Sequence, residues 1–254
     1  VVPTVTYPAS TPEAWQGRFA SLLDDEGALP VAIAGFLIEV GDQKIIMDTG
    51  LGPLRLDFPG FGPFFGGKFL DSLATTGVRR EDVTEVVFSH MHLDHVGWST
   101  IEENGQRVLT FPNARYLVTE LEWNFWYGTD HPAGPNPERV QQPLAGVIQF
   151  IAPGDTLAPG ITVLHTPGHT PGHISFELKA GDERLMLIVD LLHNIVQFAE
   201  PDWGVPFDFD TAQAVATRKA MLVELVKPDT VTGDAHFSDR VFGRLTQEDG
   251  QWTW

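Results

Sequence analysis

Residues 90–95, of sequence HMHLDH, place three imidazoles and a carboxylate within six positions, directly after a short apolar run. Neutral imidazole suits zinc and iron, and a carboxylate extends the choice to manganese and cobalt. Side chains two positions apart in an extended segment point the same way, so His90 and His92 can bind one ion. Asp94 and His95 can face a second ion beside it. The pattern predicts a metal site, and the alternative is a histidine-rich surface loop that binds nothing.

Further candidate ligands come at the ends of apolar segments later in the chain. His169 lies in the segment TPGHTPGH, where proline and glycine indicate a sharp loop. Asp190 ends the apolar run 185–189, and a charged residue there caps a turn or binds a ligand. His236 follows the short segment 229–231. Loops at strand ends are places where a rigid scaffold can present such side chains.

The order H-x-H-x-D-H, then G-H-T-P-G-H, then Asp190, then His236 resembles the metallo-β-lactamase superfamily of hydrolases. Asp48, in the triplet Asp-Thr-Gly, matches the early Asp motif of that superfamily. The resemblance runs from about Val31 to the end of the chain. It implies an α/β fold, a four-layer αβ/βα sandwich in which two sheets pack face to face with helices outside. We expect one such domain over residues 1–254, with residues 1–30 as an N-terminal extension.

The resemblance also implies two metal sites built from seven side chains. The ligands are His90, His92 and His169 for the first ion, Asp94, His95 and His236 for the second, and Asp190 between the two. Two divalent ions held about 3.5–4 Å apart lower the pKa of bound water and supply hydroxide near neutral pH. We expect zinc at both sites, with manganese, iron and cobalt as alternatives.

Four polar residues are expected to assist these ligands. Asp48 would orient ligands without binding the metal, and His173 would support them or serve the structure. His193 stands three residues after Asp190, where acyl-homoserine lactonases of the superfamily carry a nearby Tyr. It could donate a hydrogen bond or a proton to the reacting ester, or it could simply pack under a loop. Asp94 could carry a proton to the leaving oxygen.

Aromatic residues cluster in regions where related lactonases and organophosphate hydrolases build an apolar pocket over the metals. We predict that Phe64, Phe65 and Trp203 line such a pocket. Ordinary core packing and a homodimer interface are the alternative explanations for these side chains.

The amino-acid composition limits the kinds of molecule that this protein can bind. The chain has 34 acidic and 16 basic residues and a net charge of −18, which disfavours nucleic acid and leaves a small molecule as substrate. It has no cysteine, so it does not match the β-lactamases that place Cys at the second metal. No apolar run is long enough for a transmembrane helix, and no signal peptide is evident. We expect a soluble protein, cytoplasmic in preference to secreted, and a homodimer is an open possibility.

The residues and the resemblance together predict a two-metal hydrolase that opens a small, fairly apolar ester, with an acyl-homoserine lactone as the first choice. An organophosphate triester or an aryl ester is the alternative substrate. A redox enzyme with one iron, such as a persulfide dioxygenase, and a metal-binding module without catalysis are further alternatives. Thioester hydrolysis of the glyoxalase II type would need a C-terminal helical domain, for which too few residues follow His236.

Several elements must position these groups. Residues 210–226 predict a helix with Asp210 as its N-cap, and residues 58–67 are expected to form a loop. His165 is expected in the core. The other predicted helices span residues 68–76, 120–126 and part of 137–149, and the predicted strands span 31–40, 44–48, 85–89, 107–111, 115–119, 161–165, 173–178 and 184–190.

Overall fold

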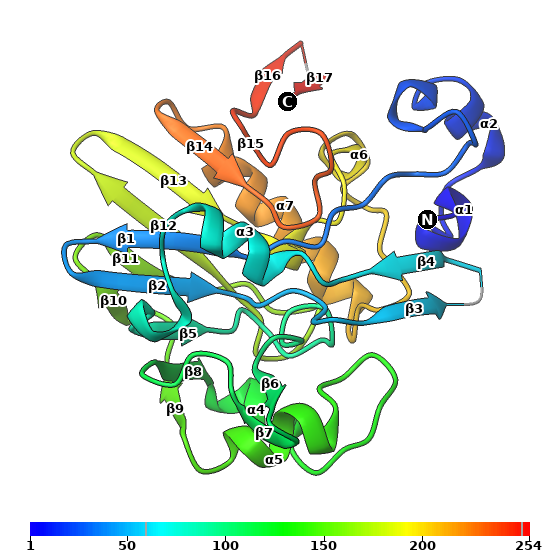
Figure 1. Ribbon diagram of the computed structural model, residues 1–254. Helices are drawn as coiled ribbons and strands as arrows, with labels where there is room; N and C mark the ends of the chain where they lie inside the picture. Colours follow the sequence, from blue (N-terminus) through cyan, green and yellow to red (C-terminus); the bar gives the residue numbers. More distant parts are fainter. Residues whose placement is uncertain (59, 250) are drawn as a thin grey trace.

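The computed structural model describes residues 1–58, 60–249 and 251–254. Two sheets face each other, and the first is built from the N-terminal half of the chain (Figure 1). Its strands, in spatial order, are β1 (Phe36–Val40), β2 (Gln43–Met47), β5 (Glu85–Val87), β8 (Arg115–Thr119) and β9 (Ile148–Ile151). β1 and β2 form an antiparallel hairpin, and the remaining pairs are parallel. The carboxyl ends of these parallel strands therefore meet at one edge.

The second sheet is built from the C-terminal half. Its strands, in spatial order, are β10 (Thr156–Ala158), β11 (Ile161–His165), β12 (Ile174–Ala180), β13 (Glu183–Leu187), β14 (Thr230–Gly233) and β15 (Phe242–Gly243). β13 and β14 are parallel, and α7 (Thr211–Leu225) lies between them in the chain. The Asp210 side chain caps α7 by accepting a hydrogen bond from the backbone of Gln213, as predicted.

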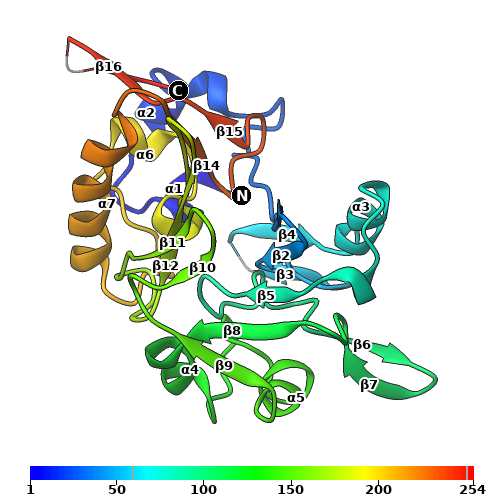
Figure 2. The same cartoon turned by 90° about the vertical axis from the view of Figure 1, so that its left-hand side faces the viewer.

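Helices cover the outer face of each sheet (Figure 2). α3 (Phe69–Thr75), α4 (Glu120–Trp126) and α5 (Gln142–Leu144) pack on the first sheet, and α7 packs on the second. The apolar cluster between the sheets includes Phe36, Met47, Val163, Phe176 and Leu187. Helix, sheet, sheet and helix thus follow one another, which confirms the four-layer sandwich.

Shorter elements complete the chain. They are α1 (Pro3–Thr6), α2 (Pro12–Gln16), η1 (Ala20–Leu22), η2 (Arg80–Asp82), η3 (Pro137–Gln141), η4 (Val189–Leu191), α6 (Val196–Ala199), and the paired strands β3 (Arg55–Phe58) with β4 (Gly62–Phe65), β6 (Thr100–Glu103) with β7 (Gln106–Leu109), and β16 (Thr246–Glu248) with β17 (Gln251–Thr253). No helix in the described part of the chain is long and apolar enough to span a bilayer.

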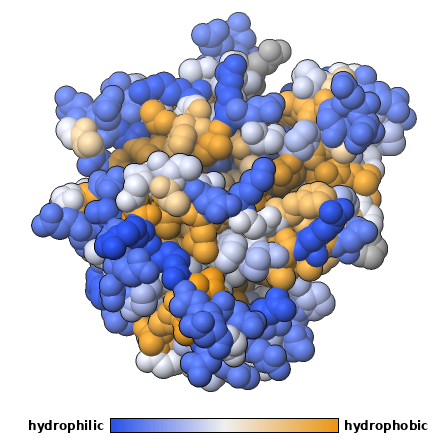
Figure 3. Space-filling model, viewed as in Figure 1, coloured by the Kyte–Doolittle hydropathy of each residue, from blue (hydrophilic) through white to orange (hydrophobic). Residues whose placement is uncertain are grey.

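Three local predictions were wrong. Residues 58–67 were expected as a loop, but Phe58 ends β3 and residues 62–65 form β4, so most of the described part belongs to a hairpin in which Phe58 and Phe64 pair across the strands. Residue 59 lies outside the described residues. Residues 31–35 precede β1 instead of extending it. His165 is the last residue of β11 and is exposed, although it shares a strand face with the buried Ile161 and Val163, so it is not a core residue. Apolar side chains gather around the middle of the face that carries the hairpin (Figure 3).

Candidate functional site

The H-x-H-x-D-H segment follows β5, at the carboxyl edge of the first sheet. His90 and His92 are buried, and His90 Nε2 lies 3.1 Å from His92 Nδ1. Asp94 and His95 come past the bend, where the Asp94 side chain keeps a quarter of its surface exposed. The sequence therefore delivers four polar side chains to the edge that faces the second sheet.

The second sheet supplies the other three side chains from loops after its strands. His169 lies between β11 and β12, Asp190 follows β13 and His236 follows β14. Asp190 is central: its carboxylate oxygens lie 3.1 Å from Nε2 of His95, 3.2 Å from Nε2 of His169 and 3.1 Å from Nε2 of His236. His169 Nε2 also lies 2.8 Å from His92 Nδ1, which links the two sheets.

The seven side chains fit a pair of metal ions. Donor atoms of His90, His92, His169 and Asp190 lie within 4.8 Å of one another, and so do those of Asp94, His95 and His236. Imidazole nitrogens that bind one zinc ion at about 2.0–2.1 Å come to such separations. Nε2 of His95 and one oxygen of Asp190 are buried without a hydrogen-bond partner among the described residues. Orphaned atoms of this kind are what a divalent ion would satisfy.

Three of the imidazoles have a hydrogen-bond acceptor at Nδ1, which leaves Nε2 facing the cluster. Nδ1 of His169 lies 3.0 Å from Asp208, Nδ1 of His236 lies 2.8 Å from the Ala32 carbonyl, and Nδ1 of His95 lies 3.0 Å from Asp48. When Nδ1 donates to these acceptors, Nε2 keeps a free lone pair for an ion.

Asp48 contacts both halves of the predicted metal centre, although it belongs to neither ligand set. Its carboxylate accepts hydrogen bonds from the backbone and hydroxyl of Ser89, at 2.8 and 2.6 Å. The same hydroxyl lies 3.0 Å from Nδ1 of His90, so hydrogen bonds link Asp48 to His95 directly and to His90 through Ser89. Its φ of 57° is unusual for a residue other than glycine. The orienting role expected of Asp48 stays a prediction.

The carboxylates and imidazoles of the cluster shift one another's pKa values. Burial alone would raise the pKa of Asp190, but the surrounding imidazoles hold it well below its usual value. Burial alone would lower the pKa of His169, yet hydrogen bonds with Asp190 and Asp208 raise it to about 9. The cluster therefore pairs buried negative charge with positive charge, a balance that divalent ions would supply once bound.

His173 lies beside the ligands without joining either set. Its Nδ1 donates to the Thr166 carbonyl at 2.9 Å, and its ring centroid lies 5.2 Å from that of His90. Burial lowers the pKa of His173 to about 3, so the ring is neutral at physiological pH. It packs against the cluster in a supporting position.

His193 reaches the cluster from the side of Asp190. Its Nε2 lies 3.3 Å from Asp190, and its backbone N–H donates to the Gln197 side chain at 2.7 Å. Burial lowers its pKa to about 4, although Asp190 opposes the shift. The ring also lines the cavity above the metal ligands, so His193 can meet a substrate there.

Two supporting carboxylates were missed in the sequence. Asp208 accepts from His169, and no sequence signal marks it among its acidic neighbours. Glu122 is fully buried on α4 and accepts from the backbone of Met91 at 2.9 Å and of Gly172 at 3.0 Å. It stands three residues after Thr119, the N-cap of α4, and this spacing is typical of a capping residue. That local explanation hides its contacts with two ligand loops.

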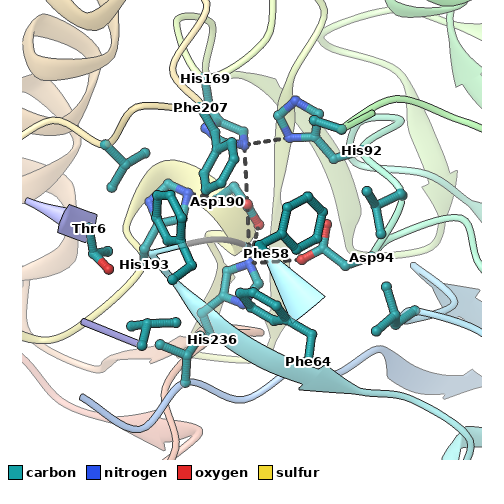
Figure 4. Close-up of a pocket in the computed structure, with 17 residues that line it drawn as sticks. Thr6, Phe58, Phe64, His92, Asp94, His169, Asp190, His193, Phe207 and His236 are labelled. Atoms are coloured by element: carbon teal, nitrogen blue, oxygen red, sulfur yellow. Dashed lines mark hydrogen bonds and ion pairs between the residues drawn. The ribbon is translucent and has the colours of Figure 1, made fainter. Parts of the chain in front are cut away.

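A cavity of about 720 Å³, including its mouth, opens over the cluster. Figure 4 shows Asp190 between His169 and His236, with Phe58, Phe64 and Phe207 around them. The other lining residues are Val1, Thr6, Val31, Leu51, Phe61, His92, Leu93, Asp94, Ala133, His193 and Val205. Apart from the cluster, the wall is almost wholly apolar, which is typical of a small-molecule site.

Two of the three predicted pocket residues are elsewhere. Phe64 lines the cavity as expected. Phe65, the next residue of β4, points to the opposite face, is 58% exposed and packs against Arg55. Trp203 packs against Tyr7 and other aromatic residues of the N-terminal segment, outside the cavity lining. The prediction for Phe65 was wrong because successive side chains of a strand point to opposite faces. The prediction for Trp203 was wrong because its ring packs against the N-terminal segment.

Comparisons with known proteins agree with this geometry. Residues 30–236 match the family described as the metallo-beta-lactamase superfamily. An N-acyl homoserine lactonase from Bacillus sp is 27% identical over 219 residues, covering 79% of each chain. N-acyl homoserine lactonase AttM from Agrobacterium fabrum is 30% identical over 139 residues, covering 52% of this chain and 49% of that protein.

AidC and AbOPH are two of the solved structures that share the fold. AidC, described as a dizinc quorum-quenching lactonase in complex with a product, superposes with a TM-score of 0.85 at 25% identity, covering 99% of this chain and 88% of AidC. The hydrolase AbOPH superposes with a TM-score of 0.79 at 27% identity, covering 100% of this chain and 89% of AbOPH. The predicted class of activity, metal-dependent hydrolysis of an ester bond, is confirmed by these relatives. The chain belongs to the metallo-beta-lactamase superfamily.

Proposed function

We propose that this protein is a two-metal lactonase that opens a cyclic ester of the acyl-homoserine lactone type, and thereby a quorum-quenching enzyme. The observation that carries the proposal is the position of the seven-residue cluster at the base of an apolar cavity. Such a site offers hydrolytic chemistry at one end and burial of an alkyl chain at the other. The curated relatives named as N-acyl homoserine lactonases support the same substrate class.

The ligand assignment follows the clusters. His90, His92 and His169 would hold one ion, the group of Asp94, His95 and His236 the other, and Asp190 would reach both. Bound divalent ions would supply hydroxide near neutral pH and polarise the ester carbonyl. Zinc is the proposed metal, because the sites are rich in imidazole and the AidC relative is described as a dizinc enzyme.

The chain's own groups would then handle protons. His193 lines the cavity next to Asp190, so it can donate a hydrogen bond to the oxygen on which negative charge develops. Asp94 lines the same cavity and keeps part of its surface exposed, so it can carry a proton to the leaving alkoxide. The apolar wall lowers the local dielectric constant and so strengthens both interactions.

The remaining partner assignments are also proposals. A net charge of −18 weighs against a nucleic acid substrate. A homodimer and a cytoplasmic location stay predictions.

The test combines metal analysis with three assays on one sample. We expect close to two metal ions per chain and hydrolysis of an acyl-homoserine lactone far faster than that of a paraoxon-type triester or an aryl ester. Asp190→Asn is expected to lose metal and activity, whereas His165→Asn at the exposed end of β11 retains both. Faster turnover of the triester or aryl ester would replace the lactonase assignment, and one iron ion without hydrolysis would overturn it.

A further inference from the structure

The N-terminal segment, residues 1–29, lies outside the part of the chain that matches the family, yet it forms part of the cavity wall. Val1 and Thr6 line the cavity together with Phe58, Phe61 and Phe64 of the β3–β4 hairpin. Figure 1 shows α1 next to the strands of this hairpin. The segment therefore meets whatever fills the cavity.

Specific contacts fix the segment in this position. The backbone N–H of Val2 donates to the carbonyl of Phe61 at 3.2 Å, which joins α1 to the hairpin turn. The N–H of Leu29 donates to the carbonyl of Val1 at 2.8 Å and closes the segment on itself. Aromatic rings add a second anchor, since Trp203 lies with its ring centroid 5.5–6.0 Å from those of Tyr7, Trp15 and Phe19.

Hydrogen bonds of Gln197 connect Trp203 to His193. The Gln197 side chain donates to the carbonyl of Trp203 at 2.7 Å and accepts from the backbone of His193 at 2.7 Å. Val205, which packs in the same apolar cluster as Tyr7, also lines the cavity. The N-terminal segment thus packs on the elements that carry both the wall of the cavity and a proposed catalytic side chain.

Thr6 is the residue of this segment whose surroundings in the cavity wall best indicate a role. Its hydroxyl donates to the Val2 carbonyl at 3.0 Å, so it needs no partner from a substrate. Among the described residues lining the cavity, it is the one polar side chain outside the metal cluster and His193. Figure 4 shows Thr6 on the His193 side of the cavity, across from Asp94 and Phe64. Thr6 therefore belongs to the His193 side of the cavity wall.

We propose that the N-terminal segment is part of the substrate site and that Thr6 is a specificity-determining residue contacting the alkyl chain of the acyl group. The inference rests on the proposed lactonase function. An ester carbonyl placed next to His193 and Asp190 has its substituent among the apolar side chains of the cavity. Each methylene that becomes buried there strengthens binding about fourfold.

A second groove offers the competing path for the chain. It shares Ala133, Phe207 and the two cluster residues His92 and His169 with the cavity. Its other lining residues are the apolar Phe125, Trp126, Pro206 and Phe209 and the polar Thr129, His131, Thr170 and Asp208. It touches only these two members of the metal cluster, whereas the cavity reaches Asp94, Asp190, His193 and His236 as well. The cavity is therefore favoured.

The experiment measures kcat/KM of the zinc-loaded protein for butanoyl, hexanoyl and decanoyl homoserine lactones. Thr6→Phe fills the cavity and is expected to lower the decanoyl value at least about tenfold, with less than about threefold change for butanoyl. Ala9→Phe adds the same ring on the exposed side of the segment and is expected to keep the wild-type dependence on chain length. Thr6→Val keeps the side-chain volume and should keep that dependence too.

Phe209→Ala in the second groove provides the opposing test. If it changes the chain-length dependence and Thr6→Phe does not, the inference is overturned while the lactonase function stands. If the wild type hydrolyses no lactone, the proposed function itself fails. Thr6→Leu adds less volume and allows the same comparison if the phenyl ring prevents folding, which thermal unfolding reveals.

Discussion

His193 is held from two directions, by Gln197 through its backbone and by Asp190 near its ring. His193→Phe keeps an aromatic ring at this position but replaces the imidazole and so removes both nitrogens. We expect kcat to fall about a hundredfold, because one hydrogen-bond or proton donor contributes factors of this size. Metal content should not change, since His193 belongs to neither ligand set.

Steady-state kinetics together with metal analysis checks this expectation. An unchanged kcat would show that the ring only packs. A parallel loss of metal would show that it supports the ligands instead of acting on the substrate.

Residue types and spacing marked the candidate ligands, and the family resemblance assigned them to two metal sites. The structure brings together all seven, with Asp48 and His173 beside them. Glu122 and Asp208 could not be found in this way, because their partners are distant in the chain and depend on the tertiary fold. Phe65 shows that one position along a strand decides between a cavity and solvent.

Among the elements, α4 joins two loops through Glu122. Its carboxylate accepts from Met91, between two predicted ligands, and from Gly172 in the His169 loop. Glu122→Gln keeps the shape but turns one acceptor into a donor that faces backbone N–H groups. We expect metal affinity to fall about tenfold, because misplaced supporting contacts cost metal binding in this range. Glu120→Gln, exposed on the same helix, is the matched control.

Competition with a chelator measures the affinity, and circular dichroism shows whether the variant is folded. A folded Glu122→Gln protein with wild-type affinity would reduce Glu122 to a structural role. Loss of affinity in both variants would point to an effect of charge alone.

Local patterns predicted elements best where the local signal and the tertiary environment agree. Residues 115–119 and 120–126 form the predicted strand and helix, and α7 starts at its predicted cap. The β3–β4 hairpin was missed because its glycines and prolines resemble a loop, while cross-strand aromatic contacts stabilise it. The four-layer arrangement followed from the family resemblance, because strand order between distant segments leaves no local trace.

At the scale of the molecule, the predicted metal ions would connect the two sheets. His90, His92, Asp94 and His95 come from the first sheet, and His169, Asp190 and His236 come from the second. Removing metal with a chelator is expected to lower the melting temperature by about 10 °C. A free metal concentration a thousand times the Kd adds about 4 kcal/mol to the free energy of unfolding, and this contribution is lost with the metal.

Differential scanning calorimetry before and after zinc is restored tests this expectation. A protein that melts at the same temperature without metal would show that the sheets need no ion between them. Partial recovery with one equivalent and full recovery with two would fit a pair of sites.

Within the described residues, the chain passes from the strands of the first sheet to those of the second between β9 and β10, through the exposed turn at residues 152–155. A cut there would separate two fragments, each with one sheet and an incomplete set of ligands. Such halves, produced as separate polypeptides, would complete a catalytic centre only on reassociation. The turn is therefore the natural place to convert this protein into a split reporter, in which ester hydrolysis records the meeting of two fused partners.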